Sequence, residues 1–247
     1  MPENGKYLYC IIKGSKPKKF EIKGIGGKDV YAICEGKLAA VVSDSEAKEY
    51  FIIRDDVMTH QKVIETVSQK YGALPVSFGT VAADAQEIKE KILRPKAREL
   101  LSVLKETEGK VELGLKALWL DMQSVFQEIA ESPVIKSFKR SSRAKLLGYQ
   151  EKISAGQLVA DLLNQKRDGE KEKILQPLKE IADDLKENKI FGDDMILNAA
   201  FLVKKGKEKE FDKQVNMLGR QYGKTVKFIY VGPLSPFNFI KLELSLK

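Results

Sequence analysis

The chain has 247 residues, which suits one large domain or two small ones at about 100 to 200 residues per domain. Hydrophobic residues make up 43% and charged residues 32%, ordinary globular values that exclude a collagen-like, mucin-like or wholly disordered chain. The formal net charge of +8 permits an anionic partner, but 35 acidic residues spread along the chain argue against a dedicated polycation.

The first third of the sequence is rich in the short β-branched and aromatic runs that are typical of strands. Strands are expected over 7–12, 30–34 and 38–43, and a Glu-Gly step joins the last two as a hairpin. Residues 13–29 are rich in Gly, Pro and Lys, which predicts an exposed, mobile loop between the first two strands.

Helices are expected after this hairpin. Acidic residues favour a helix start near 55, and apolar residues at helical spacing extend the helix to about 71. A strand is expected over 74–78, and a second helix over 85–105 that Pro95 should kink or break.

The second half begins with an expected strand over 111–120, just after Gly109. Apolar residues then step by three and four in two stretches, which predicts a helical hairpin that turns at Arg167-Asp168-Gly169. The remaining expected elements are a strand over 196–203, a helix over 207–222 and a strand over 225–231.

This alternation predicts an α+β protein made of two tandem two-layer domains, ferredoxin-like (split βαβ) in character. Residues 1–108 form the expected N-terminal α+β domain, and residues 109–231 form the C-terminal α+β domain with the inserted helical hairpin. Residues 232–247 are expected as an extended C-terminal tail.

In this tail, Pro233 and Pro236 should stop the preceding strand. Apolar residues then alternate with polar ones, as in a half-buried strand, at Ile240, Leu242, Leu244 and Leu246. Such a strand must cover an apolar surface of its own chain or pair with the sheet edge of another protein. Docking across the first domain or the interdomain cleft is the favoured alternative.

Groups for catalysis and metal binding are scarce. Cys10, Cys34 and His60 are the only cysteines and the only histidine, and no C-x2-C spacing is present, so we expect no metal site. Both cysteines lie in apolar runs and are expected as buried, reduced thiols. His60 is expected as a helix residue with one polar edge. We therefore expect no catalytic residue and no cofactor.

A basic segment at 136–145 carries five positive residues and one aromatic residue, and it can contact phosphates. An RNA-binding module that uses this segment is the alternative function. A solvated helix start is favoured, because no strand carries the stacking aromatics of an RNA-binding sheet. An enzyme is a third class, and it would need a convergent polar pocket that the sequence does not display.

Several segments match a known family in order and spacing along nearly the whole chain. They are 7–9, 36–43, His60 with 63–65, 74–81, 198–203, and Gly232-Pro233 with 236–239. Together they resemble the GvpF/GvpL family of gas vesicle proteins. Ser77 departs from the pattern, because the family commonly has arginine there.

The resemblance implies a non-enzymatic accessory protein of gas vesicle assembly, located in the cytoplasm and at the gas vesicle. Its expected partners are the small hydrophobic major shell protein and other accessory proteins, in a chaperone-like, nucleating or minor structural role. Neither a membrane nor a nucleic acid is an expected partner, and the isolated protein is expected to be a monomer. The candidate partner-binding residues are Leu74, Pro75, Phe78, Gly79, Gly232, Pro233, Pro236, Phe237, Phe239, Leu242 and Leu244.

Overall fold

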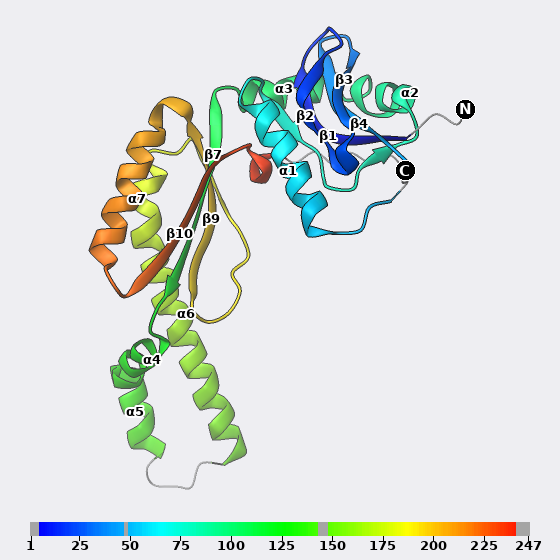
Figure 1. Ribbon diagram of the computed structural model, residues 1–247. Coiled ribbons are helices and arrows are strands. Elements are labelled where there is room, and N and C mark those ends of the chain that lie inside the picture. Colours follow the sequence, from blue (N-terminus) through cyan, green and yellow to red (C-terminus); the bar gives the residue numbers. More distant parts are fainter. Residues whose placement is uncertain (1–4, 47–48, 143–147, 241–247) are drawn as a thin grey trace. The chain divides into compact units, whose positions relative to one another are not determined.

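The computed structural model describes residues 5–46, 49–142 and 148–240, and it shows a mixed α+β protein with two antiparallel sheets (Figure 1). The chain divides into two compact units. Unit 1 contains the described residues up to Glu112 and those from Gly232 onwards, and unit 2 is Leu113–Val231. The chain therefore returns to unit 1 after it has completed unit 2.

Unit 1 is built on a six-stranded sheet whose strand order is β2-β3-β4-β1-β5, with β6 also paired to β1. The strands are β1 (Gly5–Lys13), β2 (Lys19–Lys23), β3 (Asp29–Glu35), β4 (Leu38–Ser45), β5 (Ala73–Pro75) and β6 (Val81–Ala82). Strand β1 pairs antiparallel with β4, β5 and β6, and its residues from Tyr7 to Ile12 are all buried. An apolar run at this position is what a central strand covered on both faces requires.

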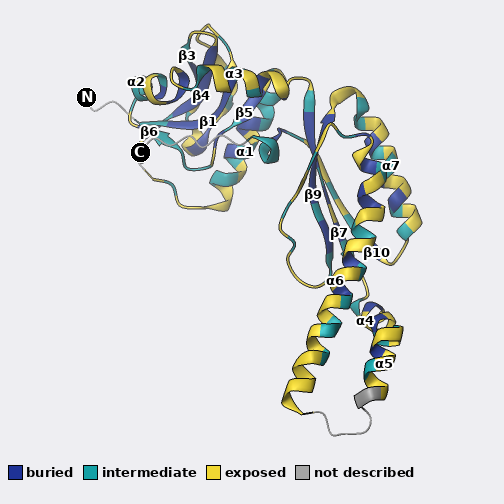
Figure 2. Ribbon diagram, turned by 180° about the vertical axis from the view of Figure 1, so that it is seen from behind, coloured by how far each residue is buried: buried dark blue, intermediate teal, exposed yellow. Residues whose placement is uncertain are grey.

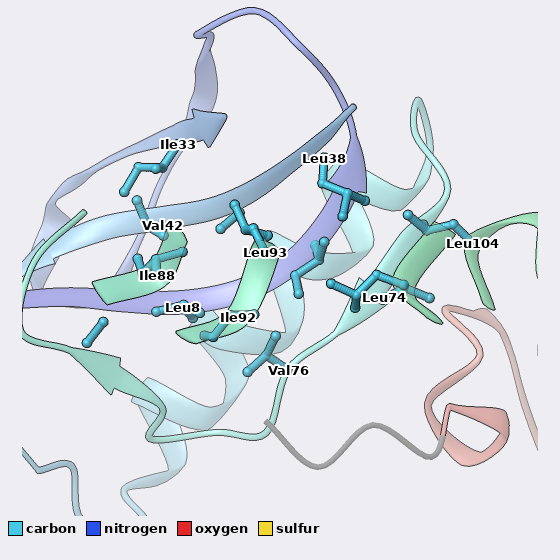
Figure 3. Close-up of a cluster of buried hydrophobic side chains, with 14 residues drawn as sticks. Leu8, Ile33, Leu38, Val42, Leu74, Val76, Ile88, Ile92, Leu93 and Leu104 are labelled. Atoms are coloured by element: carbon cyan, nitrogen blue, oxygen red, sulfur yellow. The ribbon is translucent and has the colours of Figure 1, made fainter. Parts of the chain in front are cut away.

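Helices cover the two faces of this sheet. Helix α1 (Arg54–Ser68) packs on the face that carries Tyr7 and Tyr9. The opposite face is covered by helix α2 (Ala85–Glu87), the π-helical stretch η2 (Ile88–Leu93) and helix α3 (Ala97–Glu106). Figure 3 shows this second core, in which Leu8 meets Ile88 and Ile92. The break expected at Pro95 is present, between η2 and α3.

Two expectations for unit 1 are wrong. Residues 13–29 are not only a loop, because they include β2 and a 3-10 turn, Ile25–Gly27. In β2, Phe20 and Ile22 are half-buried between exposed lysine and glutamate residues, a period-2 pattern that the many lysines hide. The strand expected over 74–78 ends at Pro75, since the chain enters a turn in which Thr80 N donates to Ser77 O at 3.3 Å.

Unit 2 has a four-stranded sheet of order β10-β7-β9-β8, with helices α6 and α7 on one side (Figure 1). Its elements are β7 (Lys110–Trp119), α4 (Met122–Glu131), α5 (Pro133–Ser142), α6 (Tyr149–Lys179), β8 (Asp184–Glu187), β9 (Met195–Lys204), α7 (Glu208–Tyr222) and β10 (Val226–Leu234). Phe201 of β9 and Phe211 of α7 are fully buried, and their ring centroids lie 5.0 Å apart. Figure 2 shows that the buried residues of this sheet lie mainly on β7 and β9.

The expected turn at Arg167-Asp168-Gly169 is wrong, because α6 runs through it as one helix of 31 residues. A glycine inside a helix costs only about 1 kcal/mol relative to alanine, and the packing of the buried residues Leu163 and Ile174 outweighs it. The helices beside the first part of α6 are instead α4 and α5, and Lys166 of α6 pairs with Glu128 of α4 at 2.5 Å. The basic segment therefore lies in the second half of α5 rather than at a helix start; its residues 143–145 lie outside the described part.

The expectation that Gly232-Pro233 stops the last strand is also wrong, because β10 continues through these residues to Leu234 and ends before Pro236. It is an edge strand of its sheet, where the missing proline N–H is tolerated. Residues Phe237–Phe239 form a 3-10 turn, and Ile240 packs half-buried on the core drawn in Figure 3. The rest of the alternating tail, with Leu242, Leu244 and Leu246, lies outside the described residues. Within the described ranges, none of the helices has the length and apolar character needed to span a bilayer.

Candidate functional site

Aromatic rings gather around Tyr7, which is fully buried on the central strand of unit 1. The ring centroids of Tyr50, Tyr9, His60 and Phe78 lie 4.8, 4.9, 5.6 and 6.1 Å from that of Tyr7. We call these five residues the Tyr7 cluster. It joins β1, the segment before α1, α1 itself and the turn after β5.

Hydrogen bonds fix the polar edges of this cluster. His60 Nε2 lies 3.1 Å from the carbonyl oxygen of Val76, which can only accept, so Nε2 carries the proton. His60 Nδ1 is then the acceptor for the Tyr7 hydroxyl at 3.0 Å. The same hydroxyl oxygen accepts from Gly79 N at 3.0 Å. The buried Tyr7 side chain thereby holds both α1 and the turn at 76–79.

Burial sets the protonation of these groups. It lowers the pKa of His60 to about 4 and raises the pKa of Tyr7 above its ordinary value. Both side chains are neutral near pH 7, and neither titrates where a general acid or base works best. The network therefore links β1, α1 and the turn at 76–79 through neutral groups. His60 uses both ring nitrogens, where the sequence indicated a single polar edge.

The first four candidate residues lie on β5 and in the turn that follows it, but they differ in exposure. Leu74 is 1% exposed within the core of Figure 3, and Pro75 is half-buried at the end of β5. Phe78 is half-buried in the Tyr7 cluster, and Gly79 has a φ of 83° in the turn that follows. Only the half-buried residues present surface to a partner.

The C-terminal candidates are divided between surface and core. Gly232 and Pro233 are exposed, Pro236 is buried, and Phe237 and Phe239 are half-buried. Phe237 packs against the same core as the Tyr7 cluster. Leu242 and Leu244 lie outside the described residues.

Sequence reasoning missed an apolar run beside the Tyr7 cluster. The side chains of Phe51, Ile52 and Ile53 are 83%, 88% and 54% exposed, and Met58 in the next turn of α1 is 56% exposed. A side chain added at Gly79 would lie 3.9 Å from the carbonyl oxygen of Tyr50, so the turn and this run are neighbours. Four consecutive apolar residues at 50–53, outside any expected strand, were the available signal.

Other reactive groups are poorly placed for chemistry. Both cysteines are free. Cys10 is buried as expected, whereas the expectation is wrong for Cys34, which is only half-buried; burial raises the pKa of each thiol. Among the described residues, no group of three or more His, Cys, Asp or Glu side chains is arranged to hold a metal ion.

Among known protein families, the model of gas vesicle synthesis protein GvpL/GvpF matches residues 5–241 of this chain. The chain belongs to the GvpL/GvpF family. This confirms the resemblance seen in the sequence.

Relatives in this family cover almost the full chain. Gas vesicle protein F of Dolichospermum flosaquae is 27% identical over 240 residues, which is 96% of this chain and 98% of that protein. Gas vesicle protein F of Haloferax mediterranei is 26% identical over 96% of this chain and 94% of its own. The crystal structure of gas vesicle protein GvpF from Microcystis aeruginosa is 27% identical and covers 96% of this chain and 99% of its own, with a TM-score of 0.85. The GvpF crystal structure from Anabaena sp. PCC7120, at 24% identity over 97% of both chains, has the same fold with a TM-score of 0.85.

Proposed function

We propose that this GvpL/GvpF family member is a non-enzymatic accessory protein of gas vesicle assembly that binds the small hydrophobic major shell protein. Its role is chaperone-like, nucleating or minor structural, alongside other accessory proteins in the cytoplasm and at the vesicle. The contact surface is on unit 1 and consists of the exposed residues Phe51, Ile52, Ile53 and Met58 with the neighbouring Phe78 and Gly79. We call it the unit 1 apolar surface.

The observation that carries this proposal is the exposure of Phe51 and Ile52, at 83% and 88%. Single exposed apolar residues are ordinary, but several consecutive ones beside a half-buried aromatic ring mark an interaction site. A hydrophobic, β-rich shell subunit aggregates unless another protein covers it before assembly. An apolar surface on an accessory protein meets that need.

The support beneath this surface favours binding. Tyr50 precedes the run, and its hydroxyl forms a 2.8 Å hydrogen bond with Ser45 Oγ at the end of β4. Its ring packs edge-on against Tyr7 at 76°, and Tyr7 in turn holds Gly79. A surface held in place before binding loses less conformational entropy on association.

The order of elements in unit 2, β-α-β-β-α-β with strand order β10-β7-β9-β8, supports the ferredoxin-like interpretation of this part of the chain. The candidates Leu74 and Pro236 are buried, so we assign them to the interior of unit 1 rather than to direct contact with the partner. The same applies to Phe237, which packs against the core beneath the Tyr7 cluster.

Co-expression with the cognate major shell protein tests the proposal. The two proteins should co-purify at low salt without detergent, and the shell protein should remain in the soluble fraction. Clean separation of the two proteins, both folded, would contradict the proposed function.

A matched pair of variants locates the contact. Phe51→Ser with Ile52→Ser should reduce recovery of the shell protein, because it removes two exposed apolar side chains from the unit 1 apolar surface. Tyr149→Ser with Ile153→Ser removes two exposed apolar side chains from α6, which are 78% and 50% exposed, and should leave recovery unchanged. The reverse result would place the contact on α6.

A further inference from the structure

Unit 2 contains a pocket of about 320 Å³ between α6 and the segment that joins β8 to β9. This volume is at the lower end of the roughly 300 to 1,000 Å³ typical of small-molecule sites. Its wall contains three cationic side chains, Arg167, Lys171 and Lys189, and two carboxylates, Asp168 and Glu187. The charge balance of the wall therefore favours an anion.

Arg167 is the unusual member of this wall. It is only 9% exposed, and its Nη1 donates to Asn164 Oδ1 at 2.6 Å while its Nη2 donates to the carbonyl oxygen of Asp193 at 3.1 Å. Its Nε has no hydrogen-bond partner among the described residues. Both acceptors are neutral oxygens, and no described carboxylate forms an ion pair with this guanidinium. A buried cation in this condition is costly, which a negatively charged acceptor would offset.

The other two cations differ in their availability. Lys171 is already paired, at 3.4 Å with Asp168 and at 3.1 Å with Glu187. Lys189 is exposed, and its Nζ lies 5.6 Å from the ring centroid of Phe191 without an ion-pair partner among the described residues. Arg167 and Lys189 are thus the two cations free to share one anion.

The remaining wall has two amides and an apolar floor. Asn198 donates through Nδ2 to the carbonyl oxygen of Lys189 at 2.9 Å, which fixes the backbone that carries this lysine. Ile196 and Leu197 are buried, and Ile190 is half-buried. Such a wall suits a ligand with a short aliphatic body behind its charged group.

We propose that this pocket binds a carboxylate attached to a short aliphatic body. The carboxylate lies against Arg167 Nε, in a charge-assisted hydrogen bond, and within reach of Lys189. The body lies along Ile190 and Ile196. The same chemistry is offered by a free dicarboxylic acid and by a glutamate side chain of a partner polypeptide. The site is in unit 2 and does not depend on shell-protein binding by unit 1.

Isothermal titration calorimetry on the full chain tests this site with four probes. Glutarate represents the free acid, and N-acetyl-glutamate N-methylamide represents a glutamate within a polypeptide. Glutaramide is the uncharged control, and inorganic phosphate is the alternative anion. At least one of the two carboxylates should bind saturably, and glutaramide should not. The tighter of the two carboxylates identifies the source of the ligand.

Three variants connect the binding to the pocket. Arg167→Met should weaken carboxylate binding at least about tenfold while the variant stays folded, because methionine fills the space and removes the unsatisfied N–H. Lys189→Gln, on the exposed rim, should weaken binding without affecting the fold and carries the test if Arg167→Met does not fold. Lys152→Gln, on the exposed first turn of α6, should leave binding unchanged.

Three results would overturn the proposal. The first is the absence of saturable carboxylate binding, and the second is carboxylate binding that is as strong in both pocket variants as in the unaltered chain. The third is tighter binding of phosphate than of either carboxylate. A drop in thermal stability of ligand-free Arg167→Met, combined with no stabilisation of the unaltered chain by either carboxylate, would assign Arg167 a purely structural role.

Discussion

Asn238 binds Glu112 at two points: its backbone N donates to Oε2 at 2.7 Å and its side-chain Nδ2 donates to Oε1 at 2.5 Å. Glu112 is 3% exposed, so this contact supplies hydrogen bonds to a buried carboxylate. Ser235 Oγ also bonds Ser68 Oγ at the end of α1. These contacts hold the segment after β10 against the rest of unit 1. Unit 1 therefore cannot complete its structure until the chain beyond residue 231 has been synthesised.

Replacing Asn238 with alanine removes a donor from a buried carboxylate. We expect the free energy of unfolding to fall by about 1.5 to 3 kcal/mol, the usual net contribution of a hydrogen bond to a charged group. Urea unfolding measures this loss. Asn216→Ala, at an exposed position on α7, is the matched control and should change stability by less than about 0.5 kcal/mol. Equal stability of the two variants would mean that the Asn238 contact contributes nothing.

The stability of unit 1 should depend on pH through His60. Its folded-state pKa is about 4 and its ordinary value is 6.5, so the unfolded chain takes up the proton first as the pH falls. The contribution is complete above pH 6.5 and is lost progressively down to pH 4, by up to about 3 kcal/mol. Urea unfolding at pH 7 and pH 4.5 should show a smaller pH-dependent loss in His60→Gln than in the unaltered chain. The same loss in both chains would mean that His60 is not buried as a neutral residue.

Gly24 is required by the close approach of Tyr9. A Cβ at this position would lie 2.2 Å from the Tyr9 hydroxyl oxygen and 3.2 Å from Ser43 Oγ, which are themselves hydrogen-bonded at 2.8 Å. Gly24→Ala should therefore destabilise the protein by roughly 1 to 3 kcal/mol, as overpacking does. Gly72→Ala, which has no atom within 4 Å of the added carbon, should be neutral or slightly stabilising in the same thermal-unfolding assay.

Phe78 tests how far the Tyr7 cluster stabilises the fold. Full truncation of a buried phenylalanine costs about 3 to 5 kcal/mol, and Phe78 is only half-buried, so Phe78→Ala should cost about 2 kcal/mol. Phe191→Ala removes a ring that is 64% exposed and should cost less than about 0.5 kcal/mol by urea unfolding. A loss below that of Phe191→Ala would leave Phe78 as a binding residue alone.

The sequence was sufficient to predict an element where a single pattern of residues determines it. Strand β1 follows from its continuous apolar run, and the break between η2 and α3 follows from Pro95. It was insufficient to predict an element where tertiary packing overrides the local preference of a residue. Gly169 indicated a turn, yet the apolar residues on both sides of it pack as one face of α6. In β2, the many lysines concealed the alternation of half-buried and exposed residues.

The candidate site shows a second limit of sequence reasoning. Tyr7, His60 and Gly79 meet through hydrogen bonds that depend on the pairing of β1 with β5, and no spacing in the sequence encodes that meeting. The apolar residues at 51–53 are visible in the sequence, but their exposure follows from the absence of a covering element among the described residues. In the sequence, Arg167 is likewise an ordinary helix residue, and its burial becomes apparent only in the folded structure.

Hydrogen exchange of the chain, free and in complex with the major shell protein, tests the proposed surface most directly. If the shell protein binds the unit 1 apolar surface, amides at 49–58 and 76–80 should exchange more slowly in the complex, because the partner covers them. Amides of α7 in unit 2 should be unaffected and serve as the internal reference. Unchanged exchange at 49–58 and 76–80, with slower exchange elsewhere in a stable complex, would contradict the account.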